Sequence, residues 1–337
     1  MTKPVKNESR PNTGRMSITN KHNGDFKKAR TNCFQTRVTL FQLNRQNTMI
    51  PYRLLDSEID HFIQEDVPYG DLTTSLLGIG SMKGEITFTT RESTVICCTE
   101  EAARVLERCG ACVHHCMKSG EKVDRGTTIL SASGHADALH AGWKVALNLL
   151  EYASGIATRT EKIVSLVKVI NPALAVVTTR KSFPGTKKVA IKAIIAGGAS
   201  PHRLGLSESI LVFRQHTEFL GGIERFLNSV KALKSKAPEH KLIVEAETAE
   251  EALNIALAGV DVVQIDKISP DELAILVPQI HQRAPNVTIS VAGGINQNNA
   301  AAYAESGVDI IVLSSVYFGK PSDIGVVMVS VKKTEPV

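Results

Sequence analysis

The sequence predicts an α/β fold in which parallel strands, joined through helices, form a closed or nearly closed barrel. From Ala173 onward, short runs rich in Val, Ile and Leu alternate with longer segments of helical periodicity. Near-continuous apolar strands joined in this way are typical of a parallel sheet covered on both faces. Six such units favour a barrel, and a doubly wound open sheet is the alternative. The expected strands are Leu174–Thr179, Ile210–Phe213, Leu242–Ala246, Val260–Ile265, Val287–Val291 and Asp309–Leu313.

Helical segments fill the gaps between these strands, and two of them begin with clear capping patterns. Thr248 with Glu251, and Ser269 with Glu272, fit a capping box, in which a hydroxyl and a carboxylate satisfy free backbone N–H groups. Pro270 adds the proline that is favoured in a first helical turn. The expected helices are Val189–Ala196, Glu218–Lys236, Ala249–Leu257, Pro270–Arg283 and Gln297–Ser306.

The chain before Ala173 predicts a separate, compact α+β domain. Ser57 is expected to cap its first helix, and Asp124–Gly126 is expected to form a hairpin turn. The last helix of this part is expected to break near Ser154 and Gly155. The expected elements are a helix at Leu54–Gln64, a strand pair in Gly84–Cys98, a helix at Glu100–Arg108, a hairpin in Gly120–Gly134 and a helix over Asp137–Ile170.

Basic charge is concentrated in residues 1–48, which have no sustained apolar periodicity. The formal net charge is +5, but residues 1–48 carry ten Lys/Arg and two Asp/Glu, so the remainder is slightly acidic. This composition predicts a disordered tail or a mis-assigned start, with the domain beginning at Met49. A basic arm that contacts nucleic acid is the alternative, although it contains neither interleaved aromatic residues nor a recognisable binding module.

Apolar content and cysteine usage indicate where the protein works. Hydrophobic residues make up 43% of the chain, enough for a real core, yet no apolar run is long enough to span a membrane. No signal-peptide pattern is present either. All six cysteines precede residue 117, which favours a reducing cytoplasm over a disulfide framework. The cysteines and histidines between Cys109 and Cys116 could bind zinc, as an alternative to thiols that are only packed or exposed.

Polar residues that suit phosphate and sugar chemistry stand at the expected carboxyl ends of the strands. Reactive groups of parallel barrels lie where strands end and loops begin. Here the early ends supply cations, the middle ends carboxylates, and the late ends Gly-rich and Ser-rich loops. Cations and backbone N–H groups bind polyanions, and facing carboxylates suit Mg²⁺, ribose hydroxyls or a developing cationic carbon. The candidates are Arg180, Lys181, His202, Arg203, Glu245, Asp266, Gly293, Gly294 and Ser314.

Taken one at a time, these residues have simpler interpretations. Arg180 and Lys181 could be a solvated pair, and Glu245 could be one partner of a salt bridge at the barrel rim. The Gly293–Gly294 pair could be only a tight turn. Their joint placement at one end of consecutive strands supports the functional interpretation, which is transfer of a phosphorylated sugar.

In their order along the chain, these residues resemble the quinolinate phosphoribosyltransferase family, also called nicotinate-nucleotide pyrophosphorylase (carboxylating). The resemblance implies an N-terminal α/β sandwich domain over residues 49–157 and an incomplete β/α barrel of about seven units over residues 158–316. Residues 317–337 are expected to return towards the N-terminal domain. The motifs are Glu65-Asp66 with Gly70-Asp71 and Thr73-Thr74, Leu147-Asn148, Ser154 to Thr158, Thr179-Arg180-Lys181 with Pro184-Gly185, His202-Arg203 with Gly205-Leu206, Val244-Glu245, Asp266, and Gly293-Gly294-Ile295.

The resemblance also implies a reaction and a role for each candidate. The family joins quinolinate to phosphoribosyl pyrophosphate with Mg²⁺ and releases CO₂. Its site lies at the barrel mouth and is completed by the other subunit of a homodimer. The implied roles are acceptor binding for Arg180, His202 and Arg203, catalysis and anion binding for Lys181, catalysis with ribose and metal binding for Glu245 and Asp266, and 5′-phosphate binding for Gly293, Gly294 and Ser314.

Two departures fall on groups that would bind the carboxylates of quinolinate. Phe213 stands where the family has a lysine, and Lys144 stands where it has an arginine. Exchanging a planar guanidinium for a point charge is not conservative at a carboxylate site. Both departures match the branch of the family associated with molybdate transport, whose acceptor the sequence does not identify beyond a small heteroaromatic acid. An ordinary quinolinate enzyme of NAD biosynthesis and a non-enzymatic anion-binding or regulatory protein are the alternatives.

Overall fold

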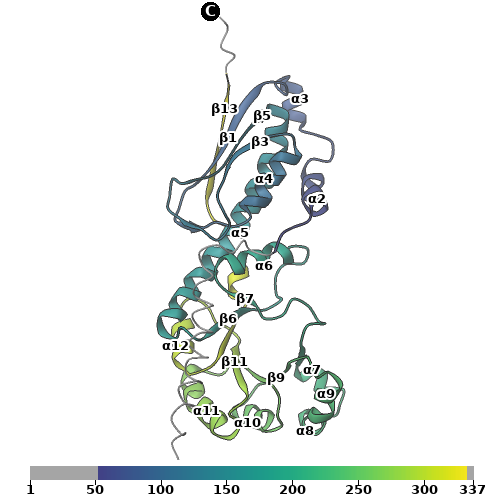
Figure 1. Ribbon diagram of the computed structural model, residues 1–337, viewed down its shortest axis with the longest axis vertical. Helices are drawn as coiled ribbons and strands as arrows, with labels where there is room; N and C mark the ends of the chain where they lie inside the picture. The colour runs from purple at the N-terminus through teal and green to yellow at the C-terminus, as the bar shows by residue number, and fades with distance from the viewer. Residues whose placement is uncertain (1–51, 332–337) are drawn as a thin grey trace, which may run out of the picture. The chain divides into compact units, whose positions relative to one another are not determined.

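The computed structural model describes residues 52–331, all of which belong to one compact unit (Figure 1). The predicted tail, residues 1–48, lies outside the described residues. The predicted α/β class is confirmed, because a seven-stranded parallel sheet and a four-stranded antiparallel sheet are both present together with helices.

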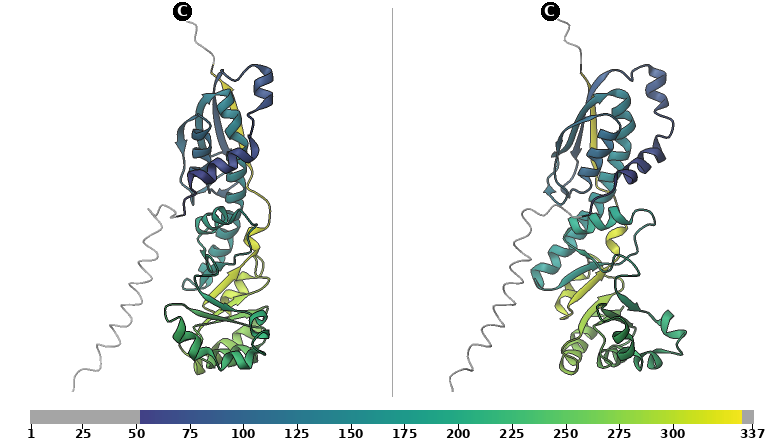
Figure 2. Two further views of the ribbon diagram at one scale, coloured as in Figure 1. Left: turned by 90° about the vertical axis from the view of Figure 1, so that its right-hand side faces the viewer. Right: turned by 45° about the vertical axis from the view of Figure 1, so that its right-hand side comes forward.

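The seven parallel strands curl into an incomplete barrel (Figures 1 and 2). Their spatial order is β7-β6-β12-β11-β10-β9-β8, so β7 and β8 follow each other in sequence but are not paired. All six expected strands are present. The additional strand, β7, has only two residues, too few for a hydrophobic pattern. The strands are β6 (Ala175–Thr178), β7 (Ser200–Pro201), β8 (Ile210–Val212), β9 (Leu242–Ala246), β10 (Val262–Asp266), β11 (Thr288–Ala292) and β12 (Ile310–Leu313).

The barrel helices match the expectation except over Glu218–Lys236 and at the start of α12, which is Ala300 and not Gln297. The capping box of Ser269 and Glu272 is complete, whereas Thr248 accepts from the Glu251 N–H and the Glu251 carboxylate accepts from Glu247 instead. The single helix expected over Glu218–Lys236 is wrong, because Gly221 and Gly222 have φ of +85° and +103°. The helices are α6 (Lys187–Ala196), α7 (Arg214–Glu218), α8 (Ile223–Leu227), α9 (Val230–Lys236), α10 (Ala249–Leu257), α11 (Pro270–Arg283) and α12 (Ala300–Glu305).

The four-stranded sheet has the order β13-β1-β5-β3, so the last strand of the chain pairs with the first strand (Figure 1). The expected strand pair and hairpin are wrong in their partners, although the turn at Asp124–Gly126 is present. The second and fourth strands pair with each other, while the fifth pairs with β1 and β3. The strands are β1 (Lys83–Thr90), β2 (Thr94–Val95), β3 (Cys112–Cys116), β4 (Lys122–Val123), β5 (Thr128–His135) and β13 (Ile324–Ser330).

The first helices of this part lie close to their expected positions. The helix α2 (Asp56–Asp66) begins before Ser57, so Ser57 is not its cap. The Glu58 carboxylate accepts from the Leu55 N–H instead. Next come α3 (Leu72–Leu77), capped by Asp71, and α4 (Thr99–Arg108). The Gly70-Asp71…Thr73-Thr74 motif therefore starts α3.

The helix α5 (Ala136–Ile170) runs without interruption for 35 residues, so the expected break at Ser154–Gly155 is wrong. These two residues serve close packing instead. Ser154 Oγ accepts from the Cys97 N–H at 2.9 Å, and a Cβ on Gly155 would lie 2.9 Å from the Lys320 carbonyl oxygen. A second close approach lies at Gly197, after α6, where a Cβ would meet the Ala157 carbonyl oxygen at 2.5 Å.

A buried ion cluster ties α4 to α6. The Lys192 ammonium is 2.8 Å from Glu100 Oε2 and also contacts Glu101, while the Lys192 side chain is only 4% exposed. Burial would raise the pKa of Glu100, but the charge and hydrogen bond of Lys192 lower it to about 2. In the part of the chain from residue 52 to residue 331, no helix combines the length and the apolar character needed to cross a bilayer.

We expect Gly197→Ala to lower the free energy of unfolding by about 1–3 kcal/mol, because the new methyl group overlaps backbone of α5. Gly205→Ala is the matched control, since a Cβ there meets no atom within 4 Å. That control should be neutral or stabilising by up to about 1 kcal/mol. Urea denaturation measures both variants, and equal stabilities would contradict close packing at Gly197.

Candidate active site

The positions that face the barrel interior can be followed along each strand to its carboxyl end. Leu211, Ile243 and Val262 form a small buried cluster on β8, β9 and β10, and Phe213 packs against it. Because strand side chains alternate between faces, the residues two positions further on share this interior face. They are Phe213, Glu245 and Gln264, with Asp266 beyond Gln264.

Glu245 and Asp266 bring two carboxylates together on adjacent strands. Gln264, in register with Glu245, donates from Nε2 to Glu245 Oε2 at 2.8 Å. Burial raises the pKa of Glu245, and the charges of Asp266 and Glu247 add to the effect. The Gln264 hydrogen bond and the Lys181 ammonium act in the opposite direction, so Lys181 lies within electrostatic range of the carboxylate pair.

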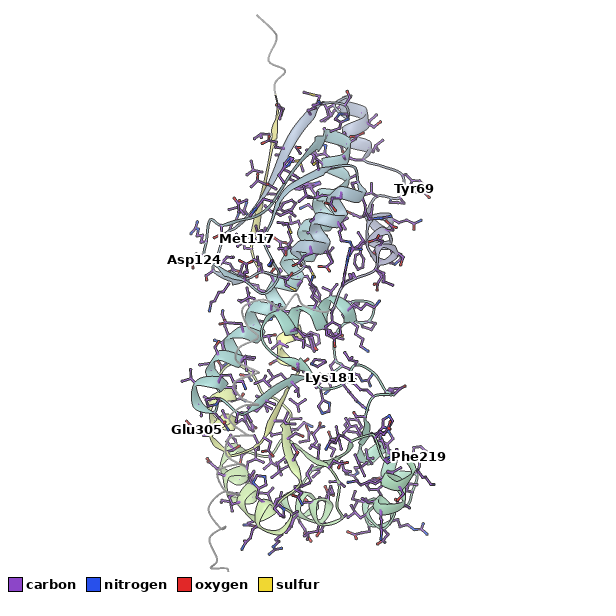
Figure 3. All side chains as sticks on the ribbon, in the orientation of Figure 1. Tyr69, Met117, Asp124, Lys181, Phe219 and Glu305 are labelled. Carbon is purple, nitrogen blue, oxygen red and sulfur yellow. The ribbon has the colours of Figure 1, made fainter. Side chains whose placement is uncertain are left out.

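The candidate cations follow β6 and β7. Figure 3 labels Lys181, which with Arg180 comes directly after β6, and both side chains are exposed. The His202 N–H donates to the Thr178 carbonyl at 2.9 Å, which holds the next loop against this strand end. Arg203 is only 7% exposed, and burial together with the charge of Arg180 lowers its pKa.

Burial and the neighbouring Arg203 also lower the pKa of His202. The Arg203 guanidinium donates to the Ser209 carbonyl oxygen at a long 3.5 Å, and Glu208 is the carboxylate that favours its charge. On this side of the barrel mouth, the nearby carboxylates therefore do not balance all of the positive charge. The excess suits an anionic ligand.

Gly293 and Gly294 fold the loop after β11 against the end of β10. Their φ angles are +96° and +70°, and a Cβ on Gly293 would lie 2.5 Å from Lys267 Cγ and 2.7 Å from Asp266 Oδ1. Glycine is therefore required at position 293 by steric contact. The helix expected at Gln297 begins only at Ala300, so these glycines do not lead directly into a helix N-terminus.

Ser314 links the ends of two neighbouring strands, β12 and β6. Its Oγ lies 2.7 Å from Thr179 Oγ1, beside Arg180. The Tyr317 hydroxyl lies 2.8 Å from Thr178 Oγ1 and 2.9 Å from the Thr179 carbonyl oxygen, within hydrogen-bond distance of both. These contacts hold the ends of β6 and β12 together.

The sequence matches both domains of one family. Residues 71–154 match the N-terminal domain of quinolinate phosphoribosyl transferase, and residues 156–326 match its C-terminal domain. The chain belongs to the quinolinate phosphoribosyl transferase family. The predicted family membership is thereby confirmed.

This chain matches its relatives over nearly the whole of their length. ModD of Pasteurella multocida, named as a pyrophosphorylase, is 38% identical over 81% of this chain and 97% of that protein. The protein of the same name from Rhodobacter capsulatus is 41% identical over 75% and 96%. A Synechocystis protein named as a nicotinate-nucleotide pyrophosphorylase (carboxylating) is 30% identical over 79% and 89%. The solved nicotinate-nucleotide pyrophosphorylase from Francisella tularensis shares the fold, with a TM-score of 0.74 at 23% identity over 84% of this chain and 100% of that one.

Two further residues of this phosphoribosyl transferase family member, Lys267 and Gln264, lie in the site, although the sequence predicted no role for them. Lys267 has a φ of +60°, and its Nζ is 2.8 Å from Asp266 Oδ2. Lysine has no preference for left-handed backbone, so no sequence pattern marks this strain. Gln264 is buried in the middle of an apolar strand, and an amide there is the one visible sign of a role.

Lys144 is a predicted site residue for which no described contact with the barrel residues is present. It is exposed on α5, and its Nζ lies 4.6 Å from the ring centroid of Trp143. Within residues 52–331, no hydrogen bond or ion pair joins it to the barrel mouth. Phe213, by contrast, lies on the interior cluster and stacks on His216 with ring centroids 5.9 Å apart.

Glu245→Gln should raise the melting temperature at pH 7 by on the order of 2 °C. The folded state raises the pKa of Glu245 above its ordinary value of 4.5, so the ionised carboxylate lowers stability once the pH exceeds that value. Glutamine removes this charge. The gain should shrink below pH 4.5, where the native carboxyl is protonated. Thermal melts at several pH values test this, with exposed Glu250→Gln as control. No gain at pH 7 would contradict it.

Proposed function

We propose that this chain transfers a phosphoribosyl group from phosphoribosyl pyrophosphate to a small heteroaromatic acid. The observation that carries the proposal is the joint placement of a carboxylate pair and a group of cations at one end of the barrel. Lys181 lies within electrostatic range of Glu245, and Arg180 lies within electrostatic range of Arg203. Relatives named as pyrophosphorylases support the same class of reaction.

The residues divide the chemistry between them. Lys181 would bind a phosphate or carboxylate of the substrates, and the Gly293–Gly294 loop and Ser314 would receive the 5′-phosphate. Loss of diphosphate leaves positive charge on the ribose carbon, and the carboxylates of Glu245 and Asp266 would stabilise it. This electrostatic role requires Glu245 to be ionised, and the Lys181 charge and Gln264 hydrogen bond favour that form.

The carboxylate pair also fits Mg²⁺ that arrives with the diphosphate. Among residues 52–331 there is no group of three or more His, Cys, Asp or Glu side chains able to hold a metal ion. Mg²⁺ commonly binds through one or two carboxylates plus substrate phosphates, which matches Glu245 and Asp266. The ion would neutralise charge on the departing diphosphate.

The acceptor would lie between Arg180, His202 and Arg203 on one side and Phe213 on the other. Phe213 presents an aromatic ring on the barrel interior, whereas Arg214 begins α7 and pairs with Glu218 and Glu247. Arg214 is therefore not available to replace a lysine at position 213. This favours an acceptor with fewer charges than quinolinate. The identity of 34–41% to proteins named ModD supports a link to molybdate transport, which molybdate uptake by a strain lacking this gene would test.

Phe213 also supports a second candidate function, an anion-binding regulator without chemistry. A member that lost acceptor binding would keep its phosphate-binding cations and lose turnover. Release of diphosphate in the presence of a panel of heteroaromatic acids separates the two, because a regulator binds phosphoribosyl pyrophosphate without consuming it.

We further infer that the chain works as a homodimer. Exposed apolar side chains occur around α3 and in the segments that follow β6, β7 and β8, and such groups commonly mark interfaces. Figure 3 labels one residue of each group, Tyr69 and Phe219, which are 99% and 93% exposed. The exposed residues are Tyr69, Leu72, Leu76, Leu77, Phe183, Leu206 and Phe219.

A shared site predicts that two inactive variants complement each other. Among the described residues, Lys144 makes no hydrogen bond or ion pair with the barrel cations of its own chain, so it would act on the site of the partner. Mixing Lys144→Ala chains with Glu245→Ala chains should restore up to about a quarter of the wild-type rate, since random pairing yields one intact site in half of the dimers. Absence of activity in verified heterodimers would contradict the shared site.

Calorimetry should detect Mg²⁺-dependent binding of phosphoribosyl pyrophosphate, weakened in Lys181→Ala by roughly ten- to a hundredfold. Loss of one charge-assisted contact is worth about 1.5–3 kcal/mol. Lys188→Ala is the matched control, because Lys188 pairs with Glu58 at 2.9 Å. If the wild-type chain ignores this ligand at millimolar concentration, the transferase proposal is wrong.

Quinolinate should be a poor acceptor. Its two adjacent carboxylates both need partners in a closed site, and Phe213 offers none. We expect kcat/KM for nicotinate mononucleotide formation at least about tenfold below that of an authentic quinolinate enzyme assayed alongside. Phe213→Lys should recover part of this difference, whereas Phe219→Lys, an exposed control, should not. Equal rates for the two wild-type enzymes would identify an ordinary quinolinate enzyme.

A further inference from the structure

Gln264 is a polar residue in the interior of the barrel, where branched apolar side chains are usual. It lies in β10 between Val262, which packs in the interior cluster, and Asp266 at the strand end. Side chains two positions apart share a face, so these three point the same way. Gln264 is 5% exposed and is in register with Glu245 of β9 and Ser290 of β11.

The two ends of the Gln264 amide differ in their surroundings. Nε2 donates to Glu245 Oε2 at 2.8 Å, whereas the buried Oε1 accepts no hydrogen bond from any described residue. Turning the amide over would bring Oε1 against the ionised carboxylate. The Ser290 hydroxyl, its neighbour in register, donates to the Val263 carbonyl oxygen instead. A buried acceptor without a donor lowers stability, and such atoms are retained mainly where function requires them.

We propose that Gln264 determines specificity for the pentose: its amide N–H fixes the Glu245 carboxylate while its amide oxygen accepts a hydrogen bond from a ribose hydroxyl. This inference rests on the proposed function, because the ligand is taken to be a pentose phosphate. A hydroxyl that reaches Oε1 also lies beside the Glu245 carboxylate, so the adjacent hydroxyl of a ribose can donate to that group. A deoxy sugar leaves one of these acceptors unpaired.

Matched sugar phosphates test the proposal directly. Calorimetry on the full chain with Mg²⁺ compares ribose 5-phosphate with 2-deoxyribose 5-phosphate. The wild type should prefer the hydroxylated sugar by about tenfold or more, because a site that pairs with a hydroxyl rejects its analogue strongly. Gln264→Met, which keeps the size but removes the polar atoms, should reduce the preference below about threefold. Gln279→Met makes the same change on the exposed face of α11 and should leave the preference intact.

The ratio of the two affinities separates recognition of a hydroxyl from simple filling of space. A residue that only filled volume would weaken the binding of both sugars alike and leave the ratio unchanged. If Gln264→Met does not fold, Gln264→Leu provides the same comparison.

The outcomes distinguish this inference from the function on which it rests. A Gln264→Met chain that keeps the full preference for ribose 5-phosphate overturns the inference. So does a wild-type chain that binds both sugars equally. A wild-type chain that binds neither these sugars nor phosphoribosyl pyrophosphate overturns the proposed function, and this inference with it.

Discussion

The close packing of α5 is the constraint on which the rest of the structure depends. A single helix carries residues of the N-terminal domain in its first half and packs against barrel elements in its second half. Two glycines allow this packing. Gly155 leaves room for the backbone at Lys320, and Gly197 lets the end of α6 pack against Ala157. The last strand then pairs with β1, so the N-terminal sheet is completed by residues that follow the barrel.

Among the described residues, β7 and β8 are the two edge strands of the sheet and leave a seam in the barrel, and the chain that connects them carries Arg203 of the site. Arg203 stands in the connection between these strands, where its guanidinium is buried with little compensation. A closed barrel would fill such a position with apolar side chains. The seam therefore explains how one fold can hold both a packed apolar floor at Leu211 and Ile243 and a charged rim above it.

Periodicity and turn chemistry in the sequence predict what is local, and they fail where distant residues decide the structure. The strands β9 to β12 and the helices α10 and α11 follow from continuous apolar runs and capping residues. The Ser154–Gly155 pair resembles a break because its partners, Cys97 and Lys320, are far away in sequence. Candidate residues at strand ends could be predicted because parallel strands end at one rim. The left-handed backbone of Lys267 could not, since lysine has no preference for that conformation.

The neighbouring ends of β9 and β10 carry three features that each lower stability. Lys267 adopts a strained backbone conformation, Gln264 buries an unpaired oxygen, and Glu245 is held beside Asp266 with a raised pKa. A sequence selected for stability alone would replace each of them, since all three positions can be relieved by single substitutions. A phosphorylated sugar would supply a complementary group for each of these side chains. Its phosphate complements the Lys267 ammonium, a hydroxyl complements the Gln264 amide oxygen, and a cationic carbon complements the carboxylates. Their coincidence at the neighbouring ends of β9 and β10 is therefore stronger support for ligand binding there than any one of the residues alone.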